Sequence, residues 1–89
     1  MKAVITVTGK DTVGIIADVA TICAEHKVNI VDITQSVLSD YFAMIMLADI
    51  EKLDIRFAEF VDILNGLGQK KGLAIHTMHE DIFNTMHHI

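Results

Sequence analysis

The spacing of apolar and polar residues along the chain predicts a short series of strands and helices. Lys2–Thr8 alternates between the two classes, as a half-buried strand does. Ile15–Glu25 instead repeats its apolar residues at helical spacing, and its buried stripe is expected to contain Ile16, Val19, Ala20 and Cys23. Asp11 precedes this helix at the position expected of an N-cap, where its carboxylate can accept backbone N–H groups.

The remaining sequence adds three strands and two helices to this pattern. The segments Ile30–Leu38 and Tyr41–Asp49 flank the polar pair Ser39-Asp40, which predicts two antiparallel strands joined by a tight hairpin. Tyr41–Asp49 is apolar on both faces, so we expect this strand to be covered on both sides. The later elements are expected to be a helix that begins at Asp54 and ends near Gly72, a strand at Leu73–Met78 and a short helix at Asp81–Ile89.

This order of elements predicts an α+β fold. It is the split β-α-β arrangement of the ferredoxin-like βαββαβ sandwich, with a four-stranded antiparallel sheet, two helices on one face and a short C-terminal helix. The usual handedness of crossover connections leaves few alternative topologies. Residues 1–89 are expected to form a single domain, because no linker or low-complexity stretch divides them. The fold alone does not define a function.

Composition and charge exclude several classes of function. Of the 89 residues 52% are hydrophobic, more than one small core hides, so either much of this apolar surplus lies on the surface or a second subunit covers it. A net charge of −5 argues against direct nucleic-acid binding. No apolar run reaches the roughly 18 residues of a membrane span, and no signal peptide precedes the first strand. The single cysteine, Cys23, cannot form an intramolecular disulfide, which predicts a cytoplasmic protein.

Two stretches carry candidate binding chemistry, and each has a plainer interpretation. The turn Gly9–Ile15 leads into a helix whose first N–H groups can hold a carboxylate, and Gly14 would let a ligand approach the backbone closely. The plainer interpretation is a capped helix with a packing glycine. Asn29–Ser36 concentrates polar side chains in an apolar chain. Its plainer interpretation is a solvated strand face or a turn-forming Asn29.

Four histidines near the C-terminus are the candidate metal ligands, since three imidazoles that meet in space can hold zinc. His76 and His79 are expected on opposite faces of a strand, and the helical neighbours His87 and His88 diverge by about 100°. No Cys-x-x-Cys accompanies them, so we expect no metal site and no cofactor. Cys23 is expected to pack in the core.

The two candidate stretches together resemble the ACT domain, a small ferredoxin-like module that senses amino acids. The resemblance is carried by Asp11-x-x-Gly14-Ile15 and Asn29-Ile30-x-Asp32-Ile33. Further segments resemble the uncharacterised family of small stand-alone bacterial and archaeal ACT proteins that is related to the glycine-cleavage repressor. These segments are Phe42-Ala43-Met44-Ile45-Met46-Leu47, Gly72-Leu73-x-Ile75 and Glu80-Asp81-Ile82-Phe83-x-x-Met86-His87-x-Ile89. The resemblance covers essentially all of residues 1–89.

The resemblance implies a side-by-side homodimer that binds a small effector at the subunit interface. In ACT domains this effector is commonly an amino acid. One subunit would contribute its turn and the other subunit the start of its second strand; these residues are Asp11, Thr12, Val13, Gly14 and Ile15 on one side and Asn29 and Ile30 on the other. The amides of Val13 to Ile15 would hold the ligand carboxylate, and Asn29 or Asp11 would meet its amino group. Many ACT turns carry Arg-Pro or Lys-Pro where this chain has Thr12-Val13, which leaves the ligand open.

The sequence therefore predicts a non-catalytic regulatory module that acts on a partner protein in trans. No nucleophile–base pair and no paired carboxylates stand at a spacing suited to catalysis, so no catalytic residue is assigned. The single arginine, Arg56, lies at the start of the second predicted helix and not in a Gly-rich anion loop. The alternative is a protein-interaction or structural module of ACT fold that binds no ligand.

Overall fold

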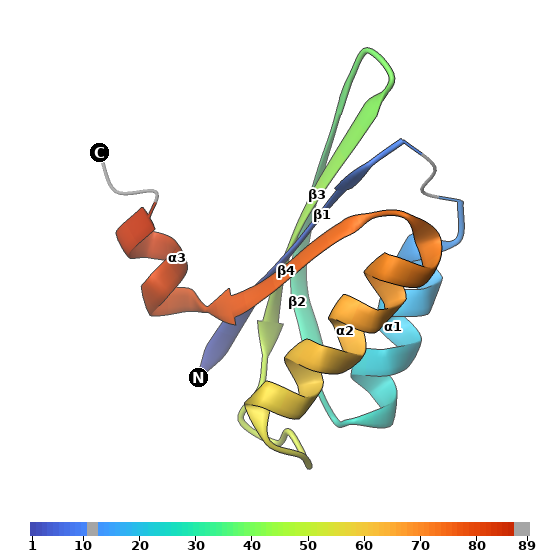
Figure 1. Cartoon of the computed structure of the whole chain (residues 1–89). Helices are drawn as coiled ribbons and strands as arrows, with labels where there is room; N and C mark the ends of the chain where they lie inside the picture. Colours follow the sequence, from blue (N-terminus) through green and yellow to red (C-terminus); the bar gives the residue numbers. More distant parts are fainter. Residues whose placement is uncertain (11–12, 87–89) are drawn as a thin grey trace.

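The computed structural model describes residues 1–10 and 13–86 and shows a four-stranded antiparallel sheet with helices on both of its sides (Figure 1). The elements follow one another in the predicted order, which confirms the ferredoxin-like α+β fold. They are β1 (Lys2–Gly9), α1 (Ile15–Glu25), β2 (Asn29–Leu38), β3 (Tyr41–Asp49), α2 (Phe57–Lys71), β4 (Ala74–His79) and α3 (Glu80–Met86).

The strands are arranged in the order β2-β3-β1-β4, so β1 and β3 are central and β2 and β4 form the edges. β1 pairs antiparallel with β3, from Lys2 opposite Asp49 to Gly9 opposite Phe42. β2 also pairs antiparallel with β3, and Asn29 lies opposite Asp49. The starts of β1 and β2 therefore lie at one end of the sheet, and the turn that follows Gly9 lies at the other end.

The hydrophobic core lies between the sheet and the helices α1 and α2. The strands turn alternate side chains into it, and each helix adds a stripe of side chains spaced four residues apart. Its most deeply buried side chains include Ile5, Val7, Ile15, Val19, Cys23, Met44, Met46, Phe60 and Leu64, all below 2% exposure. The expectation that Cys23 packs in the core is confirmed.

Helix α1 is rotated and capped differently from what the sequence predicts. It buries Ile15, Val19 and Cys23, whereas Ile16, expected on the buried stripe, is 36% exposed. The reason is that residues four apart share one helix face, and Ile16 lies about 100° away from the stripe that begins at Ile15. Its N-cap is Gly14, with φ 76° and no side-chain cap hydrogen bond. Asp11, the predicted cap, lies outside the described residues.

Helix α2 begins at Phe57, three residues later than predicted, because Asp54 is engaged elsewhere. The Asp54 N–H donates to the carbonyl oxygen of His26 at 3.3 Å, and Asp54 Oδ1 lies 3.0 Å from His26 Nδ1. These contacts join the loop before α2 to the loop before β2. The N-cap of α2 is Arg56, in an extended conformation. Asp54 thus ties two loops together and does not cap the helix.

A β-bulge marks the start of β2. The register with β3 shifts between Ile30 and Asp32, which leaves Val31 as the extra residue. Ile30 and Ile33 are three residues apart and would face opposite sides of a regular strand, yet both pack against the core. The bulge resolves this conflict and places an irregular backbone beside Asn29.

We predict that two glycines of α2 respond in opposite directions to the same substitution. A Cβ on Gly68 would lie 2.8 Å from the carbonyl oxygen of Leu73, whereas a Cβ on Gly66 would meet nothing within 4 Å. Gly66→Ala should therefore raise the free energy of unfolding by about 0.5–1 kcal/mol, the usual gain in helix propensity. Gly68→Ala should lower it despite the same gain. Urea denaturation of both variants measures this, and equal stabilisation would contradict the close approach of α2 to β4.

Candidate ligand-binding site

In the described part of the turn before α1, an open backbone adjoins a helix terminus whose N-cap, Gly14, makes no side-chain cap hydrogen bond. Gly14 has a left-handed backbone, and a Cβ placed on it would meet nothing within 4 Å. The first intrahelical hydrogen bond runs from the Asp18 N–H to the Gly14 carbonyl oxygen at 3.0 Å. The amides of residues 15–17 consequently have no partner within the helix. Val13 beside them is 85% exposed. Asp11 and Thr12, the other predicted residues of this turn, lie outside the described residues.

The charges around the described part of this turn favour an anion. The N-terminus of a helix carries about half a positive charge. Asp18 is the acidic residue of the first turn of α1, and its Oδ2 lies 2.7 Å from Lys71 Nζ, so its charge is offset by a cation. Lys10 belongs to the turn, and its Nζ lies 5.3 Å from the centre of the Tyr41 ring. A carboxylate would meet a favourable potential here.

Asn29 lines a small cavity at the opposite end of the sheet. The cavity has a volume of about 250 Å³ and is lined by Lys27, Asn29, Asp49, Glu51 and Lys52. Sequence reasoning selected Asn29 and missed the four charged residues, which come from three different segments. The lining offers two ammonium groups and two carboxylates beside one side-chain amide, a set that complements a zwitterion. Ile30, the other predicted residue of this stretch, is half-buried against the core.

One chain does not bring the two halves of the predicted site together. Gly9 and Lys2 mark the two ends of β1, and a strand rises about 3.4 Å per residue, so roughly 24 Å separates them. Gly14 follows the Gly9 end, and Asn29 lies opposite Asp49 at the Lys2 end. Within one protomer these segments cannot contact the same small ligand.

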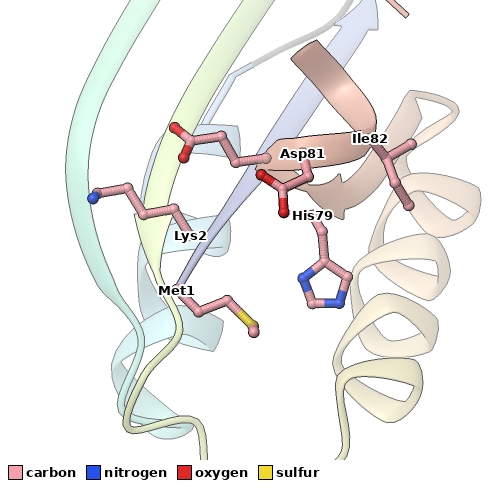
Figure 2. A pocket seen from close by; sticks show the side chains of 6 residues that line it. Met1, Lys2, His79, Asp81 and Ile82 are labelled. Atoms are coloured by element: carbon pink, nitrogen blue, oxygen red, sulfur yellow. The ribbon is translucent and has the colours of Figure 1, made fainter. Parts of the chain in front are cut away.

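A second cavity, of about 470 Å³, lies between the start of β1 and α3 (Figure 2). In this view the side chains of Met1 and His79 extend toward one another, whereas Lys2 points to the other side. The His79 ring stacks on Phe57 of α2, with 4.1 Å between ring centres. None of the predicted ligand-binding residues lines this cavity, which is bounded by Met1, Lys2, His79, Glu80, Asp81 and Ile82.

The histidines are dispersed over the described structure. Within residues 1–10 and 13–86 no three His, Cys, Asp or Glu side chains are placed to hold a metal ion. His76 is exposed, His79 stacks on a phenylalanine, and His87 and His88 lie outside the described residues. None of the described helices is long and apolar enough to cross a membrane.

Residues 2–77 match the model of the ACT domain family. The chain belongs to the ACT domain family. It is 47% identical to a UPF0237 protein of Clostridium acetobutylicum over 89 residues, all of both chains. It superimposes on an ACT domain protein from Streptococcus pneumoniae with a TM-score of 0.79 and 37% identity, over 93% of each chain.

A more distant neighbour shows the breadth of this fold. A putative glycine cleavage system transcriptional repressor matches with a TM-score of 0.66 and 24% identity, over 85% of this chain and 43% of that one. At this identity the likeness concerns the fold. The resemblance drawn from the sequence motifs is confirmed by the family model and by the relative of 47% identity. ACT domains are commonly regulatory modules that bind ligands.

Cys23 provides a test of the packing beneath α1. Burial raises the pKa of its thiol from 9.0 to about 11. Between these values the unfolded chain releases a proton that the native state retains, so native stability should fall as pH rises from 9 to 11. In a Cys23→Ala variant this contribution is absent. We expect the difference in unfolding free energy between the two proteins to shrink over this range by up to about 2 kcal/mol. A constant difference would contradict burial of the thiol.

Proposed function

We propose that this ACT domain, taken as one unit over residues 1–89, is a non-catalytic amino-acid sensor that works as a homodimer. The ligand would lie between the turn before α1 of one subunit and the start of β2 of the other, and the bound state would act on a partner protein in trans. The observation that supports this proposal is the separation of the two candidate segments. A second chain is needed to complete a site that contains both.

The edge strand β2 offers a way to join two chains. β2 borders the sheet, and along its outer side the described residues supply no neighbouring strand. Val31 and Val37 lie on it and are 49% and 70% exposed. Unpaired edges readily accept another strand, and most homodimers are built on a two-fold axis. A two-fold axis perpendicular to the sheet would pair β2 antiparallel with its copy and form a continuous eight-stranded sheet.

This pairing would bring the two halves of the site together. Antiparallel pairing reverses the partner strand, so an axis through the middle of β2 would set the partner's Asn29 level with Leu38. Leu38 lies opposite Tyr41, which neighbours Phe42, and Phe42 lies opposite Gly9 at the turn. Helix α1 contacts β2 and helix α2 contacts β4, so α1 is the helix nearer to the β2 edge of the sheet. The dimer would thus place an Asn29 from each chain beside the other chain's turn.

Each half of the shared site suits one end of an amino acid. The N-terminal end of α1, with Val13, Gly14 and Ile15, suits a carboxylate because of its amides and its positive potential. The Asn29 side offers an amide oxygen for the amino group, with the carboxylates of Asp49 and Glu51 in the same cavity. Asp11 and Thr12 lie outside the described residues, and their part in the site stays a prediction from the sequence. A single buried thiol, Cys23, accords with a cytoplasmic protein.

A thermal-shift panel tests for the ligand. Amino acids at millimolar concentration should raise the melting temperature, because a ligand at 100 times its Kd stabilises by about 2.7 kcal/mol. Gly14→Asn should abolish the shift, since asparagine tolerates the left-handed backbone while its side chain fills the open space. Gly66→Ala, remote from the site, is the matched control and should keep the shift. No shift from any amino acid would contradict the sensor and favour the interaction module without ligand.

Subunit mixing tests whether the site is shared. Gly14→Asn and Asn29→Ala should each abolish binding as homodimers. In a mixed dimer one site combines both defects, but the other is built from an intact turn and an intact Asn29. An equal mixture that exchanges subunits should therefore recover about a quarter of the wild-type sites, because half of the dimers are mixed and each restores one site of two. Titration calorimetry counts them. Failure of the mixture to recover binding would contradict a site that is shared between the two chains.

A further inference from the structure

The cavity between the start of β1 and α3 occupies the corner where β4 leaves the sheet. The pairing of β4 with β1 ends at His79, opposite Ala3, so Met1 and Lys2 extend beyond the last paired residue. At the same point the chain turns into α3 (Figure 2). The volume of about 470 Å³ lies within the range of cavities that hold small molecules. This corner is therefore large enough for a ligand of its own, apart from the turn before α1 and from Asn29.

Two walls of this cavity are held in place by the rest of the fold. The His79 ring stacks on Phe57 with 24° between the ring planes, and Phe57 packs against the hydrophobic core. Opposite this ring, the carbonyl oxygen of Met1 accepts a hydrogen bond of 3.1 Å from the Ile50 N–H. A ligand would thus meet walls that are already formed, and little free energy would be lost in ordering them.

The side chains of Met1 and Ile82 give the cavity apolar surface that is open to water. They are 76% and 53% exposed, and they come from the two ends of the chain. A ligand with an apolar body would remove this surface from water, which is favourable. The unbranched thioether of Met1 can adapt to the shape of such a body.

The charges of the cavity favour a cation. Glu80 and Asp81 both line it, and in Figure 2 the Asp81 carboxylate is directed toward the space between Met1 and His79. In the part of the chain that the structure describes, neither carboxylate takes part in an ion pair. Lys2 points to the other side, and the two carboxylates outnumber the terminal amino group of Met1. The net charge of −5 on the chain acts in the same direction.

We propose that this cavity binds an organic cation, namely a primary amine on an apolar body. The ammonium group would donate hydrogen bonds to Asp81, with Glu80 beside it, and the body would lie between Met1 and Ile82 against the His79 ring. A free amino acid fits less well, because its own carboxylate would be repelled by the two carboxylates of the cavity. The site is independent of the proposed amino-acid sensor.

Titration with phenethylamine, followed by the NMR signals of the backbone amides, tests this proposal. Saturable shifts are expected at residues 79–82. Phenethyl alcohol has the same body without the charge, phenylpropionate reverses the charge, and ethylamine has the charge without the aromatic body. Each of these should bind at least about tenfold more weakly than phenethylamine. No saturable shift from phenethylamine, or equal binding of any of the other three compounds, overturns the proposal.

A carboxylate variant tests where the ammonium group binds. Asp81→Asn should weaken phenethylamine binding by about tenfold or more, because a hydrogen bond between charged groups is replaced by a neutral one. Asp40→Asn makes the same chemical change in the hairpin turn at the opposite end of the sheet, and it should leave the affinity unchanged. Glu80→Gln replaces Asp81→Asn if circular dichroism shows that this variant does not fold. An unchanged affinity in the cavity variant, or an equal loss in Asp40→Asn, overturns the proposal.

The turn variant separates this cavity from the amino-acid site. Gly14→Asn should keep phenethylamine binding, and Asp81→Asn should keep any rise in melting temperature that an amino acid causes. If phenethylamine binds as described and no amino acid does, the sensor fails and the cation site stands. Loss of phenethylamine binding in Gly14→Asn would place the amine at the turn before α1 and overturn the cation site.

Discussion

The pairing of β1 on both of its sides is the constraint on which the rest of the structure depends. Because β3 and β4 both bond to this strand, its alternate residues Ala3, Ile5 and Val7 are held beneath α1 and α2, and β2 is left at the edge. The same pairing fixes the direction of every element. The turn before α1 emerges at one end of the sheet and Asn29 at the other, so a ligand that touches both must lie between two chains.

The apolar excess in the sequence has two locations in the structure. One is the edge of β2, where Val31 and Val37 are exposed, and the other is β3 around Ile45, which is 42% exposed. The protomer has more apolar surface than its single core hides, which is expected for a chain of 89 residues with 52% hydrophobic residues. The edge of β2 is the surface that the proposed ligand-binding dimer would cover. Binding and assembly would then be linked, because a ligand held between edges also stabilises the assembly that contains those edges.

The order of the elements, the hairpin and most of the core could be predicted from the sequence, because they follow from local periodicity and turn chemistry. The family could be read from short motifs. What could not be read depends on contacts between distant segments. The predicted start of α2, at Asp54, was wrong because Asp54 contacts His26, and nothing in the local sequence shows that contact. Counting back from the hairpin places Asn29 opposite residue 50, but the bulge at Val31 shifts it to Asp49, so the charged lining of its cavity escaped prediction.

Amide hydrogen exchange along β2 tests the central claim, that the edge of the sheet is paired with a second chain, most directly. In an isolated protomer the N–H groups of β2 that bond to β3 are protected, and those that point outward exchange freely. If two copies pair through β2, both sets should be protected in concentrated protein. The outward set should lose its protection on dilution, or in a Val31→Lys variant that places a charge on this edge. Protection of the β3-bonded set alone at every concentration would mean that the edge is bare, and the shared site would have no basis.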